Sequence, residues 1–255
     1  MIWFPWEKIK ICFICYLNET IQEGNSMKQI QKEKIITADG SPTLYMKSLD
    51  EYYHSKHGAL QEANHVYIKN GFEYWKASHQ NATKCTVFEM GFGTGLNAVL
   101  TFQAAQKSSL TLQYNCIEAY PLTQQELSEV DLSSYYPLEA QKIHEQIHAL
   151  PWDCTEKFSD QIHFKKHKIR AQEFTPEDMY DVVYYDAFGA RAQPEMWEDN
   201  CFTPLVRSMN LGGVFVTYSA KGSVRRTLQK LGLAVELIQG PPGKREMIRG
   251  VRTHL

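Results

Sequence analysis

Short strand-forming runs alternate with stretches of helical periodicity from residue 85 onward. Runs rich in apolar, β-branched and aromatic residues, bounded by glycines, prolines and charges, predict buried strands. Seven strands are expected, at Cys85–Met90, Leu112–Glu118, Ile162–Lys166, Tyr180–Asp186, Val214–Tyr218, Ala234–Ile238 and Glu246–Val251. Because helical stretches separate most of them, we expect an α/β fold with a mainly parallel, doubly wound sheet.

The connections between these strands refine the topology. Helices are expected at Ser48–Lys69, Leu96–Ala105, Ser128–Ile147 with an interruption near Pro137, and Gly222–Lys230. Only Gly240–Gly243 separates the last two strands, which leaves no room for a helix, so we expect the C-terminal strand to run antiparallel. Ile35–Met46 alternates around Asp39-Gly40, which predicts a small hairpin before the main sheet.

The first 26 residues differ from the remainder of the chain. Ile9–Leu17 is apolar but too short to cross a bilayer, and no small-residue cleavage site follows it. A polar stretch then leads to Met27. We therefore expect residues 1–26 to be a loosely attached extension, or Met27 to be the natural start, and residues 27–255 to form the functional domain.

A glycine-rich loop after the first predicted strand carries the most specific pattern. It reads Glu89-Met90-Gly91-Phe92-Gly93-Thr94-Gly95-Leu96-Asn97. Alternate glycines let the backbone approach a ligand, and the helix that follows offers free N–H groups. The third glycine comes one residue too early for the dinucleotide pattern G-x-G-x-x-G. The spacing is instead typical of the first motif of class I S-adenosylmethionine (SAM) methyltransferases, although a turn without a ligand is the simpler alternative.

Two further strands end in acidic residues, at the edge where such sheets bind ligands. Glu118 closes the second strand, and a carboxylate there can accept both hydroxyls of a ribose; the alternative is a solvated acid. Asp186 closes the fourth strand, where a buried acid is costly unless it is used. We expect Asp186 to orient an amine and take up its proton. Phe188 and Trp197 either wall this pocket or belong to the core.

Amino-acid composition, net charge and cysteine usage limit the classes of protein to which this chain can belong. The chain is 43% hydrophobic and 22% charged with a net charge of −2, which fits a globular protein without a general basic field. Six cysteines are scattered, and Cys12-x-x-Cys15 lacks a second pair of ligands. This usage suits a reducing cytoplasm and predicts no metal site. No membrane span and no obligate protein partner is expected.

Several motifs, in the same order along the chain, resemble the methyltransferase domain of the MnmC family. They are the glycine loop, Asp186-Ala187-Phe188 with Pro194-Glu195-Met196-Trp197, Ser219–Arg226, and Gly243–Met247. Upstream, Gly58–Glu62 and Val66-Tyr67 also fit, so the resemblance runs from about Met27 to Arg252. It implies a Rossmann-like class I methyltransferase fold.

The resemblance also implies a reaction: SAM-dependent methylation of the exocyclic amine of 5-aminomethyl-2-thiouridine at the tRNA wobble position. Asp186 would lie against the methyl group and the amine. SAM would be held by Glu89, Gly91, Phe92, Gly93, Thr94, Gly95, Asn97, Glu118 and Asp186.

This sequence departs from the family in two ways. The family's Asp-Gly-Phe-Ala-Pro reads Asp186–Ala190 here, so the loop after the acid is expected to take another path. The family also carries an FAD-dependent oxidase domain, for which this sequence leaves no residues. We therefore expect a stand-alone, MnmD-like enzyme without FAD, whose aminomethyl substrate is made by another route.

The C-terminal region has the charge that tRNA binding needs. From Ser219 to Leu255, eight basic residues accompany two acidic ones. A second basic group lies earlier in the sequence, at Lys165, Lys166, Lys168 and Arg170. We expect a basic face for phosphates, although a solvated helix and edge strand carry similar residues. The residues expected to contact substrate or tRNA are Phe188, Trp197, Lys221, Arg225, Arg226, Lys244 and Arg245.

Three other functions stay open from the sequence. A methyltransferase for small-molecule amines would bind no RNA. A polyamine synthase using decarboxylated SAM would need a more acidic amine pocket. A non-catalytic RNA-binding protein would keep the basic face but bind no SAM, and the intact glycine loop with Glu118 and Asp186 argues against it.

Overall fold

The computed structural model describes residues 32–130 and 137–253, which belong to the second of two compact units, Gln31–Leu255. The expectations for residues 1–26, including Cys12 and Cys15, lie outside the described residues. No helix in the described ranges combines the length and the apolar character needed to span a membrane.

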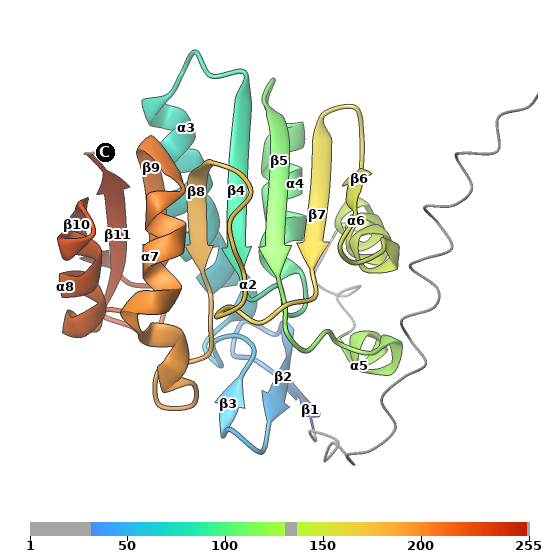
Figure 1. Ribbon diagram of the computed structural model, residues 1–255. Helices are drawn as coiled ribbons and strands as arrows, with labels where there is room; N and C mark the ends of the chain where they lie inside the picture. Colours follow the sequence, from blue (N-terminus) through green and yellow to red (C-terminus); the bar gives the residue numbers. More distant parts are fainter. Residues whose placement is uncertain (1–31, 131–136, 254–255) are drawn as a thin grey trace, which may run out of the picture. The chain divides into compact units, whose positions relative to one another are not determined.

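An eight-stranded sheet forms the centre of the described fold (Figure 1). Its order is β10 (Leu233–Gln239), β11 (Glu246–Arg252), β9 (Met209–Thr217), β8 (Tyr180–Tyr185), β4 (Lys84–Met90), β5 (Thr111–Ile117), β7 (Ile162–His167) and β6 (Thr155–Lys157). The strands from β9 to β7 pair in parallel, whereas β11 runs antiparallel to both β9 and β10. The order along the chain reverses between β4 and β8, which makes their carboxyl ends the switch point where such sheets bind ligands.

All seven expected strands are present, and the antiparallel C-terminal strand is confirmed. The eighth strand, β6, was not expected: it has three residues, pairs antiparallel with β7, and its polar sequence has no strand pattern. β9 begins at Met209, before the expected start at Val214. Gly212 and Gly213 lie within this strand, where the pairing between β8 and β9 changes register.

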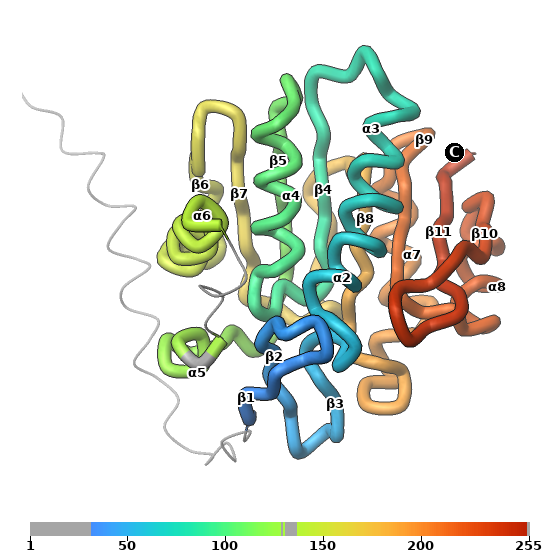
Figure 2. Tube along the Cα trace, turned by 180° about the vertical axis from the view of Figure 1, so that it is seen from behind, coloured from blue at the N-terminus to red at the C-terminus, as the bar shows by residue number. Residues whose placement is uncertain are grey.

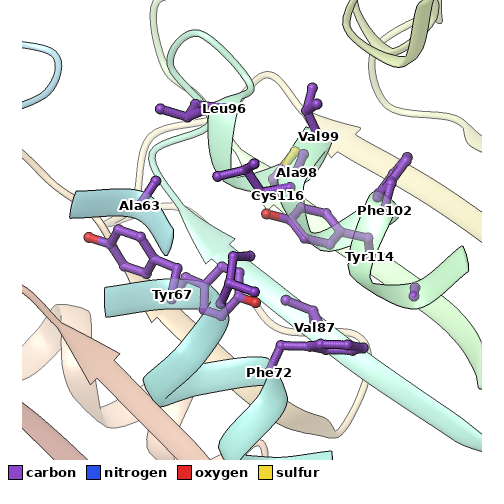
Figure 3. Packing of buried hydrophobic residues seen from close by; sticks show 14 of the residues in the cluster. Ala63, Tyr67, Phe72, Val87, Leu96, Ala98, Val99, Phe102, Tyr114 and Cys116 are labelled. Atoms are coloured by element: carbon purple, nitrogen blue, oxygen red, sulfur yellow. The ribbon is translucent and has the colours of Figure 1, made fainter. Parts of the chain in front are cut away.

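Helices cover both faces of the sheet (Figures 1 and 2). One face carries α2 (Ala59–Ala63), the π-helical segment η2 (Asn64–Glu73), α3 (Tyr74–Ser78), α4 (Leu96–Gln106) and α6 (Leu138–Ala149), and the other carries α7 (Asp199–Arg207) and α8 (Gly222–Lys230). Successive side chains of each strand point to opposite faces of the sheet and therefore belong to two separate core clusters. Val87 and Tyr184 belong to the first cluster, and Phe88 and Tyr185 belong to the second. Figure 3 shows Tyr67 and other residues of the first cluster packed together.

The segment before the main sheet differs most from expectation. β1 (Lys32–Ile36) and β2 (Pro42–Met46) form the expected hairpin. The helix expected at Ser48–Lys69 is wrong in its first half, because β3 (Glu51–Tyr52) pairs there with β2 and the rings of Tyr45 and Tyr52 lie 4.7 Å apart. The helical path starts only after Gly58 and continues to Ser78.

Two other helices differ from expectation. In place of one interrupted helix at Ser128–Ile147, α5 (Gln124–Glu129) starts with a capping box at Thr123, and α6 starts after Pro137. The helix α7 was not expected, since it is short and contains Pro204, although its buried residues have helical spacing.

The neighbouring strands β4 and β8 bring two loops close together. The backbone N–H of Asp186 donates to the carbonyl of Met90 at 3.0 Å. Gly91 follows with φ of 87°, and a Cβ there would lie 2.9 Å from the carbonyl oxygen of Asp186. Gly91 is therefore required both by its backbone conformation and by the close approach of the second loop.

Gly91→Ala should therefore destabilise the fold more than Gly232→Ala. Gly232 also has positive φ, 95°, but nothing lies within 4 Å of its Cβ position. We expect about 1 kcal/mol for Gly232→Ala, from the left-handed backbone alone, and at least about 2–3 kcal/mol for Gly91→Ala, where a backbone atom must also move. Urea denaturation of both variants measures the difference; equal losses would contradict the close approach.

Candidate active site

The glycine loop connects the end of β4 to the start of α4. Gly91, Gly93 and Gly95 all have positive φ. The N–H groups of Gly91 and Phe92 donate to the carbonyl of Ile117 at the end of β5, which holds the loop against that strand. The absence of Cβ atoms lets other parts of the protein approach the loop closely: the carbonyl of Asp186 lies against Gly91 and the ring of Tyr53 against Gly93.

Asn97, in the first turn of α4, links two carboxylates. Its side-chain amide donates to Oε1 of Glu89 at 2.9 Å and to Oδ2 of Asp186 at 2.8 Å. Glu89 is fully buried below the loop, and its other oxygen accepts from the hydroxyl of Tyr114 at 2.8 Å. Burial raises the pKa of Glu89 well above its usual range. The structure thus places Glu89 as a support for Asn97 and Asp186.

Glu118 follows β5 directly and lies beside the glycine loop. Its Oε2 accepts from the N–H of Gly93 at 3.0 Å, and its Oε1 accepts from the N–H of Tyr120 at 2.9 Å. Both bonds leave further lone pairs on a half-buried carboxylate. This orientation is compatible with the expected binding of a ribose.

Three histidines hold Thr94 in the glycine loop. The carbonyl of Thr94 faces Nε2 of His144 at 3.0 Å and Nε2 of His148 at 2.9 Å, while its hydroxyl faces Nε2 of His54 at 3.1 Å. Burial lowers the pKa of His54 to about 4 and that of His148 to about 3. Neutral imidazoles donating from Nε2 to the carbonyl therefore fit this arrangement at neutral pH. Phe92 points away from the loop surface into the core.

Asp186 occupies the switch point between β8 and β4. The hydroxyl of Tyr67, on η2, donates to its Oδ1 at 2.5 Å, and Asn97 donates to its Oδ2. Tyr67 reaches this position because η2 packs tightly on the sheet, where a Cβ on Gly71 would lie 2.9 Å from the ring of Tyr184. Burial raises the pKa of Asp186 to about 6, with the carboxylate of Glu62 adding to the effect of burial.

A second charged group lies beside Asp186. The ammonium of Lys244 lies 2.5 Å from Oε1 of Glu62 and 3.8 Å from the centre of the Tyr218 ring. The hydroxyl of Tyr218 donates to the carbonyl of Ala187, the residue after Asp186, at 2.8 Å. Residues from α2, from the end of β9 and from the β10–β11 connection therefore converge here.

Phe188 and Trp197 lie on the loop and turn after Asp186. The indole N–H of Trp197 donates to the carbonyl of Phe188 at 2.7 Å. The ring of Phe188 meets the edge of Tyr53, 5.1 Å between centroids. Both aromatics are half-buried, and Trp197 packs against the second core cluster, so its expected alternative as a core residue is met in part.

The expected basic residues fall into two groups. Lys221, Arg226 and Arg245 are exposed and Arg225 is half-exposed, at or near the edge where β9 ends and β11 begins. Lys244 instead points inward to Glu62. Outside the site, Arg249 pairs with Glu236 and Arg252 donates to the backbone carbonyls of Val206, Arg207 and Met209.

The second basic group expected at Lys165–Arg170 lies only in part on the surface: Lys168 and Arg170 are exposed, whereas Lys165 is partly buried and Lys166 is buried. Lys166 is only 1% exposed and donates to the carbonyl of Ile147 at 2.8 Å, above the ring of Trp152. Lys165 pairs with Glu177. Alternation along β7 separates these two lysines onto opposite faces of the sheet, which a count of charges does not reveal.

In the sequence analysis, Tyr67 and Glu62 appeared only as members of segments that resemble the family. Five other residues with contacts in this site were not predicted: His54, Tyr114, His144, His148 and Tyr218. Their roles arise from contacts between distant segments. The described residues include no group of three or more metal-ligating side chains placed to hold an ion. The left-handed glycine loop, the oriented carboxylate of Glu118 and the adjacent Asp186 fit SAM, whose electrophilic methyl group would supply the chemistry.

The chain is similar in sequence to known methyltransferases. A family model described as S-adenosyl-L-methionine-dependent methyltransferase matches residues 131–253. The tRNA 5-methylaminomethyl-2-thiouridine biosynthesis bifunctional proteins MnmC of Marinomonas sp. (strain MWYL1) and Cupriavidus metallidurans are 30% and 32% identical over 83% and 84% of this chain. The chain spans 32% and 33% of those two proteins, about a third of their length.

A solved structure shows the same fold. MNMC2 from Aquifex aeolicus superimposes with a TM-score of 0.75 and 20% identity, over 96% of this chain and 84% of that chain. Together, these comparisons support a class I SAM-dependent methyltransferase domain related to the MnmC family.

Proposed function

We propose that this chain transfers a methyl group from SAM to the exocyclic amine of 5-aminomethyl-2-thiouridine in tRNA. The observation that carries the proposal is the carboxylate of Asp186, which is mostly buried and is held by Tyr67 and Asn97 at the end of β8 beside the glycine loop. The curated relatives bear 5-methylaminomethyl-2-thiouridine, the product of that transfer, in their names.

Methyl transfer to an amine needs a free lone pair on nitrogen, so the amine must lose a proton. Each oxygen of Asp186 accepts one hydrogen bond from the protein and keeps a lone pair for the amine. With a pKa of about 6, the carboxylate is mostly ionised at neutral pH, and it is basic enough to receive a proton. The fixed hydroxyl of Tyr67 and amide of Asn97 hold it in one orientation during the transfer.

The exposed cations Lys221, Arg226 and Arg245 are suited to bind tRNA phosphates. They lie at or near the edge of the sheet that carries Asp186, because β11 is antiparallel and begins where β9 ends. Phosphates of a bound anticodon arm would therefore meet positive charge while the modified base reaches the site.

The direct test is methyl transfer from labelled SAM to tRNA that carries 5-aminomethyl-2-thiouridine, followed by nucleoside mass spectrometry. We expect 5-methylaminomethyl-2-thiouridine as product, and a loss of roughly 10²-fold or more in Asp186→Asn, the usual scale for a missing positioned base. SAM binding, measured by calorimetry, should persist in the variant.

Asp181→Asn is the matched control, because Asp181 lies at the opposite end of β8, where it accepts from the N–H of Thr86. It should keep methyl transfer. Full activity of Asp186→Asn would remove Asp186 from the mechanism, and transfer only to small amines would redirect the substrate assignment.

The pH dependence should also report Asp186. Protonation removes its ability to accept a proton, so kcat/KM should fall as pH drops through about 6. The substrate amine adds its own dependence, which Asp186→Asn keeps. The difference between the wild-type and variant pH profiles of kcat/KM should show a single ionisation with a pKa near 6. Identical profiles would contradict Asp186 as the proton acceptor.

Charge removal at the basic edge should weaken tRNA binding without affecting SAM. Arg226→Ala with Arg245→Ala should lower tRNA affinity and reduce the slope of log affinity against log salt by about 1.5–2, one counterion-release contribution for each cation. Lys84→Ala with Lys107→Ala removes equal charge at the opposite end of β4 and α4 and serves as control. Equal salt slopes in both pairs would reject this face for tRNA.

A further inference from the structure

The Lys244 ammonium is surrounded by the kinds of group that bind ammonium ligands in proteins. Its nitrogen contacts Oε1 of Glu62 at 2.5 Å and the face of the Tyr218 ring at 3.8 Å. Glu62 is 8% exposed, and its second oxygen is fixed by the N–H of Ser55 at 2.9 Å. Tyr218 is fixed in turn by its bond to the carbonyl of Ala187. A carboxylate and an aromatic face, both held by the backbone, form a binding site for an ammonium ion.

The proposed substrate carries the same chemical group. A primary ammonium on a methylene carbon ends both a lysine side chain and a 5-aminomethyl base. The Lys244 contacts lie beside Asp186, because Tyr218 anchors to the next residue and Glu62 is close enough to act on the Asp186 carboxyl group. An incoming aminomethyl group would therefore reach a position whose ligands are already arranged for it.

We propose that Glu62 and the Tyr218 ring form the recognition site for the substrate's primary ammonium, and that Lys244 occupies this site until the substrate displaces it. This inference rests on the proposed function and assigns the residues that select an amine. When the substrate is absent, Lys244 supplies the cation that a buried Glu62 requires. The exchange replaces one ammonium against Glu62 by another, and the bound substrate ammonium then gives its proton to Asp186 before methyl transfer.

Lys244 is able to leave without a change in the fold. Its side chain is 33% exposed, so one part of it already meets solvent. The backbone before it is fixed, since Gly243 has φ of 83° and packs against the ring of His57. The exchange therefore needs only rotation of a long side chain, a motion on the picosecond-to-nanosecond scale.

The test compares two tRNAs that differ only in the amine: one with 5-aminomethyl-2-thiouridine and one with 2-thiouridine at the same position. Binding is measured with S-adenosylhomocysteine present, so that no transfer occurs. The ratio of the two Kd values isolates the amine, because contacts to phosphates cancel. Lys244→Met should raise the preference for the amine by roughly tenfold, whereas Glu62→Gln should lower it toward one.

Arg245→Met is the matched control, because this neighbouring exposed cation should weaken both tRNAs equally and leave the ratio unchanged. A purely structural ion pair would make Lys244→Met and Glu62→Gln change the preference in the same direction, or leave it unaltered. Either result would overturn the proposal.

A second measurement uses the wild-type protein alone. The Tyr218 ring should shield the ε-methylene signal of Lys244 in ¹³C-lysine NMR, and methylammonium chloride should move the signal toward the value of a free lysine. A signal that stays shielded with the amine-bearing tRNA bound would reject displacement. If methylammonium displaces Lys244 but the tRNA is not methylated, the ammonium site stands and the proposed tRNA reaction fails.

Discussion

The side-chain amide of Asn97 is the interaction on which the rest of the site depends. Its two hydrogens reach two carboxylates, one at the end of β4 and one at the end of β8. The amide therefore fixes the start of α4, the glycine loop between β4 and α4, and the acid at the switch point relative to one another. An amide suits this place because it donates two hydrogen bonds without adding charge.

The two acids that hydrogen-bond to Asn97 differ in their burial. Glu89 has no exposed surface, accepts from Tyr114 and Asn97, and has a pKa well above its usual range. Asp186 is less completely buried than Glu89, and burial raises its pKa to about 6. This difference in burial is why the proposed mechanism assigns a supporting role to Glu89 and the proton transfer to Asp186.

The sequence predicted the elements that depend on local pattern. Apolar runs located the seven strands, and the glycine spacing with Glu118 and Asp186 located the binding edge. It failed where tertiary contacts decide: β3 replaced a helix through pairing with β2, and alternation along β7 buried Lys166. Tyr218 was missed because its role arises from contacts with Lys244 and Ala187, which lie far from it along the chain.

The contacts around Asp186 join residues that are far apart in sequence. The Tyr67–Asp186 bond spans 119 residues, and the Glu62–Lys244 pair spans 182. Each of these contacts closes a long loop of chain, so its entropic cost must be offset by the packing of the elements that carry it. Lys244 reaches α2 only because β11 pairs with β9. The proposed acceptor site is therefore sensitive to any change that loosens the C-terminal strands, even one that leaves the glycine loop intact.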